Sequence, residues 1–332
     1  MLIIVEGPDG AGKTTLAGEL ESRISTSVDI LHRGPPTSHP LDEYEMPLLN
    51  YRPGYGDTII CDRWHWGECV YPSVFGRPTR MDAAAFRHIE LFLLSRGAVV
   101  VLLDPEAEVL RDRLAARGDL NPTTREVQVS ALHGFRRVAG FSMLPILRVS
   151  RMRTDAAVSH ILRVAHKLDT ATAQLAHLVT YVGPARPELL LMGDVRHRIA
   201  EDPDGPRRLH PAFVPYGSTS GRWLLNGLTQ RTLWRVGLAN ACDVDDPRQV
   251  WETVGRPLAV ALGRRADVAL HAAGVPHGAV PHPQYLRRFF HASADEYHEV
   301  LLRSVAGGGV DDLSGWRPAN SWLTQPRETV NT

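Results

Sequence analysis

Short apolar runs alternate with longer amphipathic segments along the first half of the chain. The runs at residues 2–5, 58–61 and 98–103 are unbroken and strand-sized, which is typical of strands buried on both faces of a parallel sheet. Between and after them, apolar positions recur every three or four residues and predict helices at residues 14–24, 81–96, 105–117 and 155 to about 177. This alternation predicts an α/β fold with helices on both faces of the sheet.

A second series of the same kind begins after a proline-rich loop at residues 183–187. Its predicted strands lie at residues 189–192, 236–239 and 258–262, with a short one near Val280. We therefore expect a first domain at 1–168, a helical connector at 169–182 and a second, three-layer α/β domain at 183–305. Residues 306–332 are rich in Gly, Asp, Pro and Asn and are expected to form a poorly ordered tail.

Composition narrows the class of protein. Hydrophobic residues make up 43% of the chain and charged residues 22%, as in an average soluble globular protein. Lys plus Arg and Asp plus Glu both number 37, and this zero net charge argues against a strongly basic nucleic-acid-binding protein but allows a local basic groove. Cys61, Cys69 and Cys242 are too scattered for a disulfide framework or a four-cysteine metal site. No apolar run is long enough to cross a membrane and the chain starts directly with a strand, so we expect a cytoplasmic protein.

The segment after the first predicted strand fits the phosphate-binding pattern G-x-x-x-x-G-K-[ST], which ends here in Lys13 and Thr14. Glycines in such a loop let backbone N–H groups face the phosphates, and the next helix adds its positive dipole end. Lys13 is expected to reach the β- and γ-phosphates of ATP, and Thr14 to hold Mg²⁺. An accidental glycine-rich turn is disfavoured because a strand and a helix flank the loop. The predicted phosphate-binding residues are Gly7, Asp9, Gly10, Ala11, Gly12, Lys13, Thr14 and Thr15, with Arg113 from a later helix.

Two motifs together resemble thymidylate kinases, over residues 1–168. One is the string E-G-x-D-G-x-G-K-T-T that starts at Glu6, and the other is Asp62-Arg63-Trp64 after the second apolar run. The resemblance implies that Asp9 touches the sugar of the acceptor nucleotide and that Arg63 clamps the phosphates being joined. Asp62 would act through water on Mg²⁺ or on the acceptor, with a surface ion pair to Arg63 as the alternative.

The same resemblance extends to further positions on the acceptor side. Arg33 stands where the family has an arginine that binds the acceptor phosphate, and Arg77 is expected near the same pocket. Trp64, Trp66 and Tyr71 are expected either to stack on the base or to pack in the core.

Residues 118–122 resemble the mobile lid of that family, and Arg113, Arg117 and Arg125 flank it. Because the loop has Gly10 where some thymidylate kinases have an arginine, a lid arginine should supply positive charge to the transition state. We expect Arg117 in that role, with a solvated helix face as the alternative. The expected catalytic residues are thus Lys13, Asp9, Arg63, Asp62 and Arg117, and the expected metal-binding residues are Thr14 and Asp62.

Two departures from the family pattern lie on the acceptor side. Residues 67–69, Gly-Glu-Cys, replace a usual polar residue after the Asp-Arg motif, and residues 34–36, Gly-Pro-Pro, replace a Glu-Pro-Gly-Gly-Thr-type segment. These departures do not affect the expectation that ATP is the phosphate donor. They do weaken the expectation that dTMP is the acceptor.

In the second half, short motifs resemble the uracil-DNA glycosylase superfamily in order and spacing. Gly193 and Asp194 occupy the turn after a predicted strand, and Phe213 stands where the family has an aromatic residue that stacks on the base. Asn240 matches an asparagine that reads a pyrimidine edge, and His282 matches a late histidine that faces the base or a phosphate. The resemblance implies a base pocket made by these residues, although Asn240 and His282 taken singly are also common turn residues.

Cleavage by this pocket is not expected. Val195 stands where active members of that superfamily have the aspartate that activates water, and valine cannot accept a proton. The pocket is therefore expected to bind a base or nucleotide without cleaving it.

Three functions follow from these patterns. The first is an ATP-dependent phosphotransferase acting on a deoxypyrimidine nucleoside monophosphate, dTMP or a modified relative. The second is a kinase that phosphorylates 5-hydroxymethyluracil within DNA, with the second domain holding a flipped base. The third is a DNA-repair role led by the second domain, with the glycine loop as a nucleotide sensor, against which Val195 argues. A homodimer is compatible with the sequence.

Overall fold

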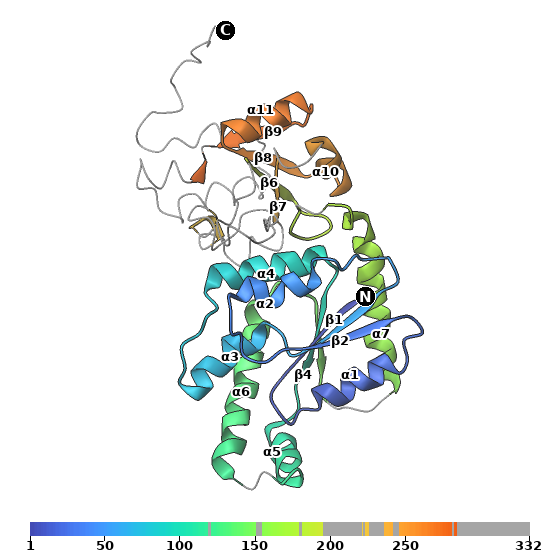
Figure 1. The fold of residues 1–332 in the computed structure, drawn as a ribbon, viewed down its shortest axis with the longest axis vertical. Coiled ribbons are helices and arrows are strands. Elements are labelled where there is room, and N and C mark those ends of the chain that lie inside the picture. Colours follow the sequence, from blue (N-terminus) through green and yellow to red (C-terminus); the bar gives the residue numbers. More distant parts are fainter. Residues whose placement is uncertain are drawn as a thin grey trace, which may run out of the picture.

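The computed structural model is shown in Figure 1. It describes residues 1–118, 121–150, 155–178, 181–194, 221, 223–225, 236–241, 246–280 and 282–283.

In the described part of the first half, five parallel strands form a sheet in the order β2-β3-β1-β4-β5. The strands are β1 Leu2–Glu6, β2 Val28–His32, β3 Thr58–Asp62, β4 Val99–Leu103 and β5 Ile146–Val149. The three predicted strands are confirmed as β1, β3 and β4, which are the central, fully buried ones. The pattern missed the two edge strands because β2 and β5 are only partly buried and contain polar residues.

Helices cover both faces of this sheet. They are α1 Lys13–Glu21, α2 Pro40–Tyr44, α3 Trp66–Phe75, α4 Ala83–Ser95, α5 Ala107–Ala116, α6 Pro122–Phe141 and α7 Asp155–Thr172, with 3-10 turns η1 Met46–Leu48 and η2 Ala173–Leu175. The four predicted helices correspond to α1, α4, α5 and α7, whereas α2, α3 and α6 were not predicted. One face of the sheet packs on α1 and α7, and the other contributes to an apolar cluster with α2, α3, α4 and α6.

The second half also contains a parallel sheet, whose described strands follow the order β7-β6-β8-β9. They are β6 Leu189–Gly193, β7 Val236–Asn240, β8 Leu258–Leu262 and β9 His277–Val280, and the described helices are α10 Pro247–Thr253 and α11 Arg264–Ala272. All four predicted strands are therefore confirmed. The relation of this part to the glycosylase superfamily stays a prediction, and the expected tail at 306–332 lies outside the described residues.

Helix α4 lies on the side of the first part that faces the second (Figure 1). The main-chain N–H of Gly183 donates to the Leu91 oxygen at 3.0 Å, and Nη1 of Arg87 donates to the Leu225 oxygen at 2.7 Å. The apolar cluster around α4 continues into Val182 and into β6. The two halves are thus packed together at α4. No helix in the described ranges is long and apolar enough to cross a membrane.

Candidate functional site

The loop between β1 and α1 has a backbone conformation that depends on its glycines. Gly7, Gly10 and Gly12 have φ values of 144°, 83° and 98°, which side-chain-bearing residues rarely adopt. A Cβ atom on Gly7 would lie 2.8 Å from the main-chain oxygen of Leu103, and one on Gly10 would lie 2.7 Å from Cδ2 of Leu114. Helix α1 starts directly after Gly12 with no side-chain cap, so its N-terminus is suited to an anion.

The ammonium group of Lys13 lies inside this loop. It donates to the main-chain oxygens of Gly7 and Pro8, both at 2.8 Å, and lies 3.5 Å from Oδ1 of Asp9. Only 5% of Lys13 is exposed, and this burial lowers the pKa of its ammonium group. A buried cation held by two main-chain carbonyl groups at a helix N-terminus is well placed to bind a phosphate.

A hydroxyl and a carboxylate converge beside the loop. Oγ1 of Thr14 donates to Oδ2 of Asp62 at 2.8 Å, and Nδ1 of His32 lies 3.2 Å from the same oxygen. Asp62 is buried, and its Oδ1 has no hydrogen-bond partner among the described residues. Mg²⁺ that is shared with phosphates needs only one or two such protein ligands, so Thr14 and Asp62 fit the predicted metal pair. The described residues contain no cluster of three His, Cys, Asp or Glu side chains that could hold a metal ion by itself.

Arg63 has a left-handed backbone, with a φ of 67°, which is uncommon for a residue other than glycine. Its N–H donates to the Val5 oxygen at 3.1 Å, and its Nη2 lies 2.8 Å from Oδ1 of Asp9. The preceding residue, Asp62, bonds to Thr14 instead. Asp62 and Arg63 therefore do not pair with each other, because each contacts a residue of the glycine loop or of α1.

A buried carboxylate holds the turn after β3 in this shape. Oε1 of Glu6 accepts from the N–H groups of Trp64 and Trp66, at 3.0 and 3.1 Å, while its Oε2 has no hydrogen-bond partner among the described residues. Burial raises the pKa of Glu6 to about 7, although Lys13 and the two N–H groups act against the rise. Sequence reasoning used Glu6 only as part of a motif, because this contact joins residues 58 and 60 positions apart.

A cavity of about 120 Å³ lies beside the loop and Asp9. All the residues predicted for acceptor binding line it, namely Arg33, Arg63, Trp64, Tyr71 and Arg77. Tyr71 stacks on Phe75 at 5.6 Å and meets Phe135 edge-on at 5.8 Å, and both of these rings also line the cavity. Trp66 is fully buried and donates from Nε1 to Glu90, so it packs in the core.

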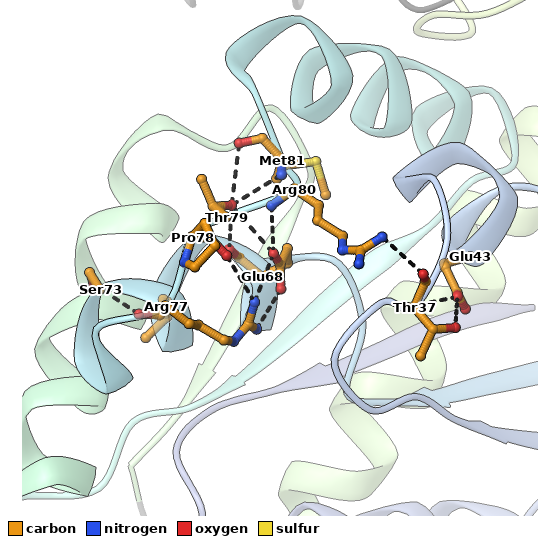
Figure 2. Close-up of polar contacts among 10 residues, drawn as sticks. Thr37, Glu43, Glu68, Ser73, Arg77, Pro78, Thr79, Arg80 and Met81 are labelled. Carbon is orange, nitrogen blue, oxygen red and sulfur yellow. Dashed lines mark hydrogen bonds and ion pairs between the residues drawn. The ribbon is translucent and has the colours of Figure 1, made fainter.

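Each arginine of the cavity faces an acidic side chain. Arg63 pairs with Asp9, and Arg33 lies 3.9 Å from Glu43. Arg77 makes two hydrogen bonds to Glu68, at 3.1 and 2.6 Å (Figure 2). Sequence reasoning noted Glu68 only as part of a departure from a family pattern, and it gave no role to Glu43.

Helices α5 and α6 contact the loop in two places. Nη1 of Arg113 donates to the Ala11 oxygen at 3.1 Å, and Oε1 of Gln128 on α6 accepts from the Asp9 N–H at 2.9 Å. Arg117 is exposed at the end of α5, and no described hydrogen bond or ion pair joins its side chain to the loop. Its catalytic role stays a prediction.

At the carboxyl edge of the second sheet, Gly193 and Asn240 end the adjacent strands β6 and β7. Oδ1 of Asp194 accepts from the Ala266 N–H at 2.9 Å, in the first turn of α11. Asn240 is buried, and its Nδ2 has no partner among the described residues.

His282 lies at the same edge. A Cβ atom on Gly263 would be 3.2 Å from both Oδ1 of Asp194 and Cβ of His282, so these three residues meet. Burial lowers the pKa of His282, and the Asp194 carboxylate acts in the opposite direction. Phe213 and Val195 lie outside the described residues, so the base pocket as a whole stays a prediction.

Comparison with known proteins concerns the first half. A probable thymidylate kinase of Archaeoglobus fulgidus is 29% identical over 147 residues, which cover 37% of this chain and 73% of that protein. The N-terminal half resembles a nucleotide kinase. No protein-family model matches the chain.

Two solved structures are similar at lower identity. The YorR protein of Bacillus subtilis in complex with phosphorylated GDP is 23% identical with a TM-score of 0.40, over 50% of this chain and 97% of that one. Deoxyadenosine kinase from M. mycoides with bound dCTP is 16% identical with a TM-score of 0.32, over 51% of this chain and 100% of that one.

Proposed function

We propose that this protein transfers the γ-phosphate of ATP to a deoxypyrimidine nucleotide, dTMP or a modified relative, bound in the cavity beside the glycine loop. One observation carries this proposal: the loop that encloses the Lys13 ammonium opens directly onto a cavity lined by Asp9, Arg33 and Arg63. A donor site and an acceptor site that adjoin in this way are what in-line phosphoryl transfer requires.

The roles of the residues follow from their positions. Lys13 exchanges its bonds to the loop oxygens for phosphate oxygens, and the first N–H groups of α1 bind the same phosphates. Arg63 leaves Asp9 and holds the phosphate that moves, while Asp9 turns to the acceptor sugar. Thr14 and Asp62 would hold Mg²⁺, which would supply positive charge to the phosphates when bound.

A second candidate is phosphorylation of 5-hydroxymethyluracil in DNA. The observation that favours it is the packing of α4 against the second half, whose sheet edge gathers Asp194, Asn240 and His282. The carboxyl edge of a parallel sheet is a common place for ligands. In this candidate the second half would hold a flipped base for the kinase half.

A transfer assay with γ-labelled ATP tests both candidates. The acceptors are dTMP, dUMP, 5-hydroxymethyl-dUMP and DNA that contains 5-hydroxymethyluracil. Label on a free monophosphate supports the first candidate, and label on DNA alone supports the second. If the folded protein labels none of them, both candidates are wrong and a nucleotide-sensing role is the remaining hypothesis.

A further inference from the structure

The three arginine–carboxylate pairs of the cavity differ in burial. Arg63 and Asp9 are each 39% exposed and share one 2.8 Å contact. Arg33 and Glu43 are 36% and 17% exposed and lie 3.9 Å apart. In the third pair Arg77 is 31% exposed, but Glu68 is 0% exposed and accepts two hydrogen bonds from its guanidinium group.

The burial of the acidic partner determines which arginines can exchange that partner for a phosphate. Exposed ion pairs contribute little stability, so Arg33 and Arg63 can exchange their acids for a ligand at small cost. If Arg77 left Glu68, an ionised carboxylate would stay buried without a cation, which is strongly unfavourable. Arg77 is therefore held in place whether or not a nucleotide is bound.

Further bonds fix the segment that bears Arg77. Oε1 of Glu68 also accepts from the Arg80 N–H at 2.8 Å, and the Arg80 side chain donates from Nη1 to the Thr37 oxygen at 2.9 Å. Thr37 in turn donates to Glu43 from its N–H and its hydroxyl. Figure 2 shows Arg80 reaching from Glu68 toward Thr37. The chain after α3 is thus fastened across to the segment that follows Arg33.

We propose that Arg77 contacts the uncharged nucleobase of the acceptor and not its phosphate, and that Glu68 is the positioning residue that holds it there. This inference rests on the proposed function, because it concerns the acceptor end of the same cavity. Together, Glu68 and Arg77 carry no net charge, which suits a neutral ligand. The ring faces of Tyr71, Phe75 and Phe135 line the same cavity and suit a planar base.

The chemistry of the guanidinium group narrows the class of base. Arginine offers five N–H donors and no acceptor. In Arg77, Nη1 and Nη2 each donate to Glu68, and Nη1 also donates to the Pro78 oxygen at 3.3 Å. Its remaining N–H groups fit carbonyl oxygens, such as those of a uracil or thymine ring. The phosphate of the acceptor is then left to Arg33 and Arg63.

Calorimetric titration with thymidine and with dTMP separates the two ends of the acceptor. The single change Arg77→Gln would leave Glu68 buried without a cationic partner. The test variant is therefore the double change Glu68→Gln/Arg77→Gln, and it is compared with Arg33→Gln. We expect the double variant to lose roughly tenfold in affinity for both ligands equally, and Arg33→Gln to lose roughly tenfold for dTMP alone. ATP affinity should stay unchanged in both.

Two results would overturn this assignment. One is a double variant that binds dTMP more weakly but thymidine as well as the wild type does, which would place Arg77 on the phosphate. The other is a folded double variant that binds thymidine and dTMP as tightly as the wild type does, which would show that Arg77 contacts neither end of the acceptor. If the wild type binds ATP but neither thymidine nor dTMP, the proposed acceptor itself is wrong.

The single variant Glu68→Gln gives a readout that a purely structural role would not change. It leaves Arg77 as an unpaired cation in the cavity, so inorganic phosphate should inhibit transfer at roughly tenfold lower concentration than in the wild type. Glu126→Gln is the matched control, because Glu126 makes the same two-bond contact to Arg111 on the exposed surface of α5 and α6. Unchanged phosphate inhibition in folded Glu68→Gln would contradict the proposal. If this variant does not fold, the double variant decides the question.

Discussion

Two strand-to-helix turns of the molecule each follow an inner strand of a parallel sheet, but the helices after them begin differently. Between β1 and α1 the turn runs from residue 7 to 12, and the helix starts with no side-chain cap. Between β8 and α11 the turn is the single residue Gly263, and Asp194 of the neighbouring strand end accepts from the Ala266 N–H. A helix N-terminus attracts anions in both cases. The N-terminus of α1 is therefore open to a ligand, whereas the carboxylate of Asp194 binds the N-terminus of α11.

Replacing Lys13 tests most directly whether the turn between β1 and α1 binds the phosphate donor. Lys13→Ala removes the cation from the open turn, and phosphoryl transfer should fall by about 10³-fold because a preorganised charge at the transition state is lost. The chain has one other lysine, Lys167, which is exposed on α7, so Lys167→Ala is a matched control with unchanged transfer. Initial rates with labelled ATP measure both. Transfer by Lys13→Ala at the wild-type rate would show that the open turn is not the donor site.

The pH dependence of stability tests the burial of Glu6, the last residue before the open turn. The pKa of Glu6 rises from 4.5 to about 7 in the fold, mainly through burial, so the unfolded chain loses this proton first. The stability that the protonated group provides below pH 4.5 is lost as the pH rises through 7, and it amounts to about 3 kcal/mol for a shift of this size. Glu6→Gln keeps an oxygen for the Trp64 and Trp66 N–H groups but cannot ionise.

Urea unfolding of wild type and Glu6→Gln at pH values from 4 to 8 measures this effect. The difference in unfolding free energy between the two proteins should grow in favour of the variant as the pH rises. A constant difference across that range would mean that Glu6 ionises as readily in the fold as in the unfolded chain.

The smallest expected effect is at the closed turn. Asp194→Ala should lower the free energy of unfolding by about 1 kcal/mol, the usual contribution of a carboxylate that caps a helix. Asp246 caps α10 through the Arg248 N–H at 2.9 Å, so Asp246→Ala should have a similar cost. Thermal unfolding measures both, and the transfer rate should stay unchanged. A loss of transfer in Asp194→Ala alone would show that the second sheet edge takes part in the reaction.

The sequence predicted the central strands because their signal is local. Runs such as residues 98–103 are apolar without interruption, and only a strand buried on both faces needs that pattern. Strand β2 was not predicted because it is an edge strand with Asp29 and His32 among its five residues. Helix α3 was not predicted because Pro72 lies inside it.

The residues of the candidate site also differ in how far the sequence alone could predict them. The glycine loop is a contiguous motif, so its residues could be predicted from the sequence. The structure brings Thr14 to Asp62 and Lys13 to Asp9. The acids that hold the arginines could not be assigned, because the partner of Arg63 is 54 positions earlier in the chain and Glu68 acts through a turn that the sequence pattern did not reveal. Long-range pairing of this kind appears only once the fold is known.

The apolar cluster shared by α4, Val182 and β6 bears on any attempt to shorten the protein. A fragment that ends at residue 178 would lose the partners of α4 and expose buried side chains to water. A contiguous exposed apolar surface promotes self-association, so the truncated first half should be poorly soluble when it is expressed. Experiments meant to isolate the proposed phosphate-transfer site should keep the chain through β9 and disable the second half by point substitutions.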